Sequence, residues 1–111
     1  MNKVSKKIQS DIYFKIHSKL GIPVSTTKAY WHIITGIKHP ALKGKEVQVK
    51  KVLSNPDEIR VSKKDKTVLL FYKSIGKYYL CVVIKILKKR AFIITAYKTE
   101  KIKEGELKWK R

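Results

Sequence analysis

The chain has 111 residues, enough for one ordinary domain, and its 27 Lys and Arg against 8 Asp and Glu give a formal net charge of +19. Hydrophobic residues make up 43% of the sequence, which favours a folded core over a disordered basic tail. The single cysteine, Cys81, excludes a disulfide framework, and one cysteine with three histidines cannot supply a closed zinc site of known ligand spacing.

The N-terminal stretch carries a pattern typical of a helix. Apolar residues recur at every fourth position from Val4 to Leu20, which predicts a first helix over residues 1–21, ended by Gly21. Residues 22–25 are then expected to form a short extended piece.

Two further helices are expected before residue 55. Ser25–Thr27 offer N-caps for a second helix through Tyr30 to Ile37, which His39 and Pro40 end. A third helical stretch follows Gly44, and its apolar residues on one face are Val49, Val52 and Leu53.

After the turn signal at residues 55–57, the hydrophobic pattern changes to a period of two. Strands are expected over residues 58–62, 67–73, 78–87 and 91–99, with short polar turns between them, and residues 107–110 can pair at an edge. The order of elements predicts a single α+β domain over residues 1–111, with N-terminal helices packed on a four-stranded antiparallel sheet.

Alternation in the last long strand assigns its side chains to two faces. Phe92, Ile94 and Ala96 share one face and are expected to lie in the core. Thr95 and Tyr97 share the other face with Ile93 and Thr99. The hydroxyl groups of this second set fit a face exposed to solvent and fit an active-site face equally well.

The positive charge is concentrated in two regions. Residues 1–45 hold nine Lys against one Asp, and residues 66–99 hold seven Lys and one Arg with no acidic residue. Since Lys predominates over Arg, binding to a phosphate backbone is expected more than base-specific readout, and RNA or DNA is the expected partner. A membrane partner is not expected, and the lack of a signal-peptide pattern favours a reduced, cytoplasmic protein.

The chemistry-bearing residues suit a reaction without metal or cofactor. No carboxylate pair has the spacing of a two-metal or glycosidase site, and no Gly-rich segment has phosphate-loop spacing. The remaining candidates are His32, His39, Arg60, Ser62, Lys85, Thr95, Tyr97 and Thr99. These residue types suit cleavage of RNA by its own 2′-hydroxyl, which needs a base, an acid and cations for the phosphorane charge.

Each candidate also has a purely structural interpretation. His32 is as well suited to a structural or capping role in its helix, and His39 before Pro40 suits a turn. Lys85 interrupts an apolar run, where the commonest outcome is a side chain that extends its ammonium group to water. Arg60 stands where the chain otherwise prefers Lys, which favours contact with a planar anion.

An ordered series of segments between Tyr30 and Trp109 points to a known group of proteins. The segments are Trp31–Ile33, Lys38–Lys45, Asn55–Arg60 with Ser62, Leu70–Tyr72, Tyr79–Lys85 and Phe92–Tyr97. This series resembles the small nucleases of the barnase, EndoU, colicin and RelE-like superfamily, in particular their short phage- and mobile-element-associated members. The resemblance implies helices followed by a four-stranded antiparallel sheet, and metal-independent RNA cleavage, often as a toxin or effector. Residues 1–21 lie outside it.

The resemblance also implies roles for individual residues. His32 resembles the helical histidine of these nucleases, Arg60 the basic residue on their first strand, and Lys85 the basic end of their central strand. Thr95 and Tyr97 resemble the polar positions of their late strand. The candidates for the glutamate base of barnase-type enzymes are Glu46 and Glu58.

The sequence therefore predicts a metal-independent endoribonuclease of the toxin or effector type. The expected catalytic residues are His32, Arg60, Thr95 and Tyr97, and the expected substrate-binding residues are Lys85, His39, Ser62 and Lys73. No metal or cofactor is expected. One alternative is a non-catalytic RNA- or DNA-binding module with tyrosines as stacking platforms. Another, compatible with the nuclease, is a toxin–antitoxin component bound by a small acidic partner.

Overall fold

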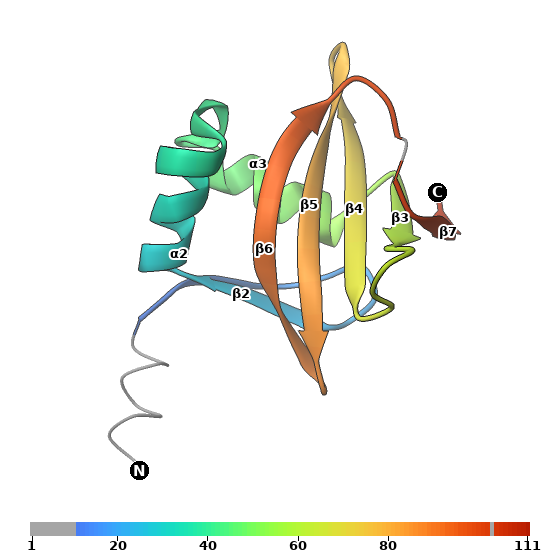
Figure 1. Cartoon of the computed structure of the whole chain (residues 1–111), viewed down its shortest axis with the longest axis horizontal. Helices are drawn as coiled ribbons and strands as arrows, with labels where there is room; N and C mark the ends of the chain where they lie inside the picture. Colours follow the sequence, from blue (N-terminus) through green and yellow to red (C-terminus); the bar gives the residue numbers. More distant parts are fainter. Residues whose placement is uncertain (1–10, 103) are drawn as a thin grey trace.

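The computed structural model describes residues 11–102 and 104–111, in which helices lie against one face of a single twisted sheet (Figure 1). The strands are β1 (Ile12–His17), β2 (Pro23–Thr27), β3 (Glu58–Val61), β4 (Val68–Ile75), β5 (Tyr78–Leu87), β6 (Arg90–Thr99) and β7 (Glu106–Lys110). The helical segments are α2 (Lys28–Ile33), the π-helical turn η1 (Ile34–Lys38), the 3₁₀ turn η2 (Pro40–Leu42) and α3 (Glu46–Ser54). No helix in the described part of the chain is long and apolar enough to cross a membrane.

The sheet has seven strands in the order β1-β2-β6-β5-β4-β3-β7. All neighbouring strands are antiparallel except β2 and β6, which pair in parallel. The α+β class is confirmed, and so is the edge strand near the C-terminus, which pairs with β3. The prediction of a four-stranded antiparallel sheet is wrong. The parallel contact joins segments far apart in the sequence through Val24–Ala91 and Ser25–Phe92, and local periodicity cannot reveal such pairing.

The first predicted helix is also wrong within the described residues. Residues 12–17 form β1, which pairs with β2 through the turn at Gly21. A spacing of four residues is a multiple of two, so it fits one face of a strand as well as a helical stripe. Phe14 decides between them, because it is buried on the same strand face as the half-buried Ile16. Residues 1–10, including Val4, lie outside the described residues.

The second and third helices are confirmed, with local causes that the sequence carries. The Thr27 hydroxyl accepts a hydrogen bond from the Tyr30 amide at 3.1 Å and so caps the start of α2. In α3, Val49, Val52 and Leu53 are buried against the sheet, as their spacing predicts. Figure 1 shows α3 behind β4 and β5 and α2 beside β6, so the sheet face toward the viewer carries no helix.

A β-bulge in β6 changes which of its side chains face the helices. The register runs from Ile84–Ile93 to Val83–Thr95, so Ile94 has no opposite residue on β5. Ile93 and Ala96 therefore both lie in the core on the helix side. The prediction that Ile94 lies in that core is wrong, since Ile94 packs on the helix-free face.

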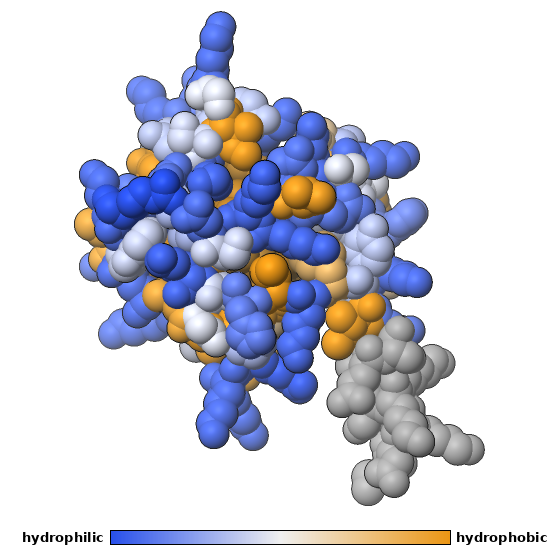
Figure 2. Space-filling view, turned by 180° about the vertical axis from the view of Figure 1, so that it is seen from behind, coloured by the Kyte–Doolittle hydropathy of each residue, from blue (hydrophilic) through white to orange (hydrophobic). Residues whose placement is uncertain are grey.

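The prediction that Phe92 lies in the core is wrong as well. Its side chain is 37% exposed, so it is not part of the core. Figure 2 shows the molecule from behind, on the side of the helices, where hydrophilic side chains predominate and hydrophobic patches are separate. On the other, helix-free face, β6 presents Thr95 and Tyr97 beside Leu70 and Val83.

Candidate active site

A hollow of about 550 Å³ opens on the helix-free face of the sheet. Its apolar floor comes from Val68, Leu70 and Val83 on the two central strands. The polar residues around it are Ser62, Lys63 and Lys64 on one side, Thr95 and Tyr97 on another, and Glu104 and Gly105 on a third. We call this the sheet hollow. Its size lies in the range of ordinary small-ligand sites.

Three of the predicted site residues line the sheet hollow, and sheet register explains why. Thr95 lies opposite Val83, Val83 opposite Leu70, and Leu70 opposite Arg60, so one row crosses four strands. Thr95 and Tyr97 lie on β6, and Ser62 directly follows β3. They therefore flank the hollow from the two outer strands of these four.

Arg60 lies beneath the wall of the hollow rather than in its lining. Its Nη1 donates a hydrogen bond to the Gly105 carbonyl at 3.0 Å, and its Nε pairs with the Glu58 carboxylate. Gly105 has a φ of +86°, and a Cβ there would stand 2.8 Å from the Val61 carbonyl oxygen. Arg60 therefore holds the segment before β7 against β3, where only glycine fits.

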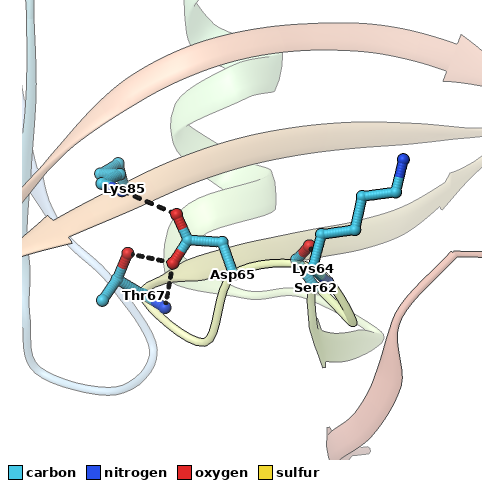
Figure 3. A network of polar contacts seen from close by, with 5 residues as sticks. All are labelled: Ser62, Lys64, Asp65, Thr67 and Lys85. Carbon is cyan, nitrogen blue, oxygen red and sulfur yellow. Dashed lines mark hydrogen bonds and ion pairs between the residues drawn. The ribbon is translucent and has the colours of Figure 1, made fainter.

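Lys85 anchors the loop that carries the lysines of the hollow. Its Nζ donates to Asp65 Oδ2 at 2.7 Å, while the Thr67 amide and hydroxyl donate to Oδ1 at 2.9 and 2.6 Å. Figure 3 shows these bonds, with Ser62 and Lys64 on the same loop. The Lys85 ammonium, followed by the Thr67 groups, holds the pKa of the Asp65 carboxyl well below its usual range.

His39 does not line the sheet hollow but lies against Tyr97, which does. The centroids of the two rings are 5.8 Å apart, and the imidazole is half-buried. The His39 amide donates to the Ile34 carbonyl at 2.7 Å, and its carbonyl accepts from the Leu42 amide at 3.0 Å. These bonds fix the backbone on both sides of the ring.

A second contact ties the helical layer to the strand that carries Tyr97. The Tyr30 hydroxyl of α2 donates to the Ile94 carbonyl at 2.7 Å, at the bulge of β6. Since η1 continues α2 directly, this bond helps to hold the segment that leads to His39 against β6.

Tyr97 belongs to a buried polar row. Cys81 lies opposite Tyr97 on one side and opposite Tyr72 on the other. Burial, and then the neighbouring Cys81, raises the pKa of the Tyr97 hydroxyl above its usual value, and burial does the same for Tyr72. Burial also raises the pKa of the Cys81 thiol to about 12. Near neutral pH, Tyr97 is therefore a hydrogen-bond donor, and the Cys81 thiol is not a nucleophile.

Two predicted residues lie away from the sheet hollow. His32 is exposed on α2 and lines a separate hollow of about 300 Å³, which we call the helix hollow. The two hollows share no lining residue. Lys73 donates from Nζ to the Asn55 carbonyl at 3.0 Å, beside the end of α3. The sequence predicted a catalytic role for His32 and a substrate-binding role for His39, and the structure places only His39 beside a residue of the sheet hollow.

The two candidate glutamates also lie apart. Glu46 is in the helix hollow, where its Oε2 accepts a hydrogen bond from the Tyr13 hydroxyl at 2.7 Å. Glu58 is buried at 7% exposure and pairs with Arg60. The sequence did not indicate Glu104 or Gly105 as part of a site. The isolated glycine among charged residues was the available signal for a close backbone approach.

The electrostatics of the sheet hollow favour an anion. Lys63 and Lys64 are exposed at its rim and take part in none of the three ion pairs found among residues 11–102 and 104–111. Glu104 is the acidic residue of the lining. No group of three or more His, Cys, Asp or Glu side chains able to hold a metal occurs in the described residues. Comparison with protein-family models, curated proteins and solved structures finds no match to this chain.

The sheet hollow thus joins a protonated phenol, two further hydroxyls and two lysines, and the His39 imidazole lies against the phenol. These groups can exchange a proton, donate hydrogen bonds to phosphate oxygens and balance negative charge. They are the functions that phosphodiester transfer requires.

Proposed function

We propose that the protein is a metal-independent endoribonuclease and that the sheet hollow is its active site. The placement of the His39 ring 5.8 Å from the Tyr97 ring carries the proposal. Of the three histidines, His39 is the one that lies against a residue of this hollow, so it replaces His32 as the proposed acid–base group. The resemblance to small nucleases and the net charge of +19 support an RNA substrate.

In the proposed reaction the neutral His39 imidazole takes the proton of a ribose 2′-hydroxyl. The 2′ oxygen bonds to the adjacent phosphorus, the bond from phosphorus to the 5′ oxygen breaks, and water protonates the leaving oxygen. The products are a 2′,3′-cyclic phosphate and a free 5′-hydroxyl. Tyr97 donates a hydrogen bond to a phosphate oxygen, which its raised pKa permits throughout the neutral range.

The cations have two different tasks. Lys63 and Lys64, exposed at the rim, balance the charge of the phosphates on either side of the cleaved bond. Arg60 and Lys85 are engaged with Glu58 and Asp65, so they position the walls of the hollow.

The test is cleavage of end-labelled RNA in EDTA by the wild type and by His39→Ala and His32→Ala variants. We expect cyclic phosphate ends, loss of cleavage in His39→Ala, and wild-type cleavage in His32→Ala. The two histidines are matched in type and lie in different hollows. Equal activity of both variants, or dependence on divalent metal, would overturn the proposal.

The charge distribution favours one other function, a non-catalytic nucleic-acid-binding module. The described residues form only three ion pairs, so most of the lysines are available to phosphates. Such a module would bind RNA with a steep salt dependence and leave it intact in every sample. An acidic partner protein that neutralises the same lysines is compatible with either function.

A further inference from the structure

The sheet hollow contains a buried hydroxyl without a hydrogen-bond partner. Two buried side-chain polar atoms in the described residues lack a partner, Thr95 Oγ1 and Thr26 Oγ1. Thr95 lies in the lining of the sheet hollow, in the row with Leu70 and Val83. Buried hydroxyls are nearly always hydrogen-bonded, because leaving one unpaired costs free energy. A turn of the Thr95 side chain about χ1 would bring this oxygen to the hollow, where a ligand group would supply the missing partner.

The floor beside this hydroxyl selects the chemistry of that group. Val68, Leu70 and Val83 form an aliphatic surface, on which a charged phosphate would lose its hydration without compensation. A nucleobase is a flat group with apolar faces and a polar edge, so its face fits the floor and its edge meets a hydroxyl. The lysines stand at the rim, outside this floor, where the phosphates would remain hydrated.

We propose that the floor of the sheet hollow is a subsite for one unpaired nucleobase, whose edge hydrogen-bonds to Thr95 Oγ1. This inference rests on the proposed function and deepens it. In a duplex the base faces are stacked and the pairing edges are occupied, so the subsite selects single-stranded RNA. Thr95 and Tyr97 are two residues apart on one strand, roughly 7 Å. The bound base therefore belongs to the nucleotide whose 2′-hydroxyl lies near His39.

The substrates for the test are DNA oligonucleotides with a single ribonucleotide, which confines cleavage to one bond. The ribonucleotide carries adenine, cytosine, guanine, uracil or no base. We expect the abasic substrate to be cleaved at least about tenfold more slowly than the best of the others, because the subsite contacts are lost.

Thr95→Val is isosteric and removes only the hydroxyl. It should change the ratio of cleavage rates among the bases by about two- to tenfold, the effect of one neutral hydrogen bond. Thr26→Val is the matched control, because it removes the other unpartnered buried hydroxyl from a strand outside the hollow. Its ratios should equal those of the wild type. Cleavage of the abasic substrate at the full rate, or unchanged ratios in Thr95→Val, would overturn the subsite while the nuclease proposal stands.

A binding measurement separates the subsite from the reaction. Nucleoside monophosphates and ribose 5-phosphate are titrated into the His39→Ala variant, and the methyl NMR signals of Val68, Leu70 and Val83 are followed. We expect the nucleotides to shift these signals, ribose 5-phosphate to leave them in place, and Thr95→Val to weaken the response. If no RNA is ever cleaved, the nuclease proposal fails and these shifts alone decide the subsite. Equal shifts from ribose 5-phosphate, or none from any nucleotide, would reject it.

Discussion

The sheet hollow and the helix hollow each combine a tyrosine, a glutamate and lysines, but they differ in how a histidine is placed. His32 lines the helix hollow, whereas His39 meets the sheet hollow through its contact with Tyr97. The two tyrosines also differ in burial and in hydrogen-bond partner. Tyr97 is half-buried in a row with Cys81, and burial raises the pKa of its hydroxyl. Tyr13 is 41% exposed, and its hydroxyl is already committed to the Glu46 carboxylate at 2.7 Å. The comparison shows that similar residue types are placed in different surroundings, and the proposed chemistry depends on those of the sheet hollow.

The supports of the two hollows differ as well. The sheet hollow is built across four hydrogen-bonded strands, which hold its side chains in fixed rows. The helix hollow lies between the short helix α2, the start of α3 and edge strand β1. Sheet rows maintain geometry better than a six-residue helix whose outer face is exposed.

The largest expected difference between the hollows is in RNA cleavage when each tyrosine loses its hydroxyl. Tyr97→Phe should lower the cleavage rate by roughly 10²-fold or more, since one donor to the developing phosphorane charge disappears. Tyr13→Phe should cleave like the wild type. Single-turnover rates on labelled RNA measure both, and equal rates for the two variants would remove the basis for placing chemistry in the sheet hollow.

The next difference is in the free energy of unfolding when a glycine of each hollow gains a methyl group. Gly105→Ala places a Cβ against the Val61 carbonyl at positive φ, and we expect a loss of roughly 2–4 kcal/mol. Gly44 in the helix hollow also has positive φ, +80°, but nothing lies within 4 Å of its added Cβ. Gly44→Ala should lose only about 1 kcal/mol in urea unfolding. A loss as small in Gly105→Ala would show that the wall beside Arg60 is not closely packed.

A smaller effect is expected from removing the unpartnered hydroxyls. Thr95→Val and Thr26→Val should each raise the free energy of unfolding by about 1 kcal/mol, because an unpaired buried polar atom is replaced by a methyl group. Urea unfolding measures both. Destabilisation of Thr95→Val would mean that its hydroxyl has a partner in the free protein, which would also remove the ground for the base subsite.

The smallest effects are local and depend on pH. The pKa of Asp65 lies below its ordinary 3.8 because of the Lys85 ammonium, and that of Glu46 lies below its ordinary 4.5 because of the Tyr13 hydroxyl. Each ionised carboxylate therefore contributes to the stability of the fold at pH values above its ordinary pKa. This contribution is lost as the pH falls through the lowered pKa of the folded state. Side-chain NMR titration should show Lys85→Met raising the pKa of Asp65 but not that of Glu46. Tyr13→Phe should do the reverse.

Local patterns made α3 and the four central strands predictable from the sequence. Val49, Val52 and Leu53 lie at helical spacing, and β-branched residues alternate in the strands, so neighbouring residues alone determine these elements. The stretch around Phe14 was predicted as a helix and forms a strand, because spacing by four residues fits both. The parallel pairing of β2 with β6 depends on distant residues and leaves no local pattern.

The site was predictable in its residue types and less so in its assembly. Thr95, Tyr97 and Ser62 were identified from the sequence, and sheet register brings them to one hollow. The meeting of His39 with Tyr97 depends on how the helical layer sits on β6, which no pattern in either segment encodes.

The bulge makes one hydrogen bond between the helical layer and the sheet depend on a single residue, Ile94. Deleting Ile94 would keep Ile93 opposite Ile84 and Thr95 opposite Val83, so every hydroxyl would stay on its face of a straightened strand. What would vanish is the carbonyl that receives the Tyr30 hydroxyl. The helical layer would lose this hydrogen bond to β6 while its buried side chains still pack on the sheet. We therefore expect the position of the imidazole relative to the phenol to change although neither residue is altered.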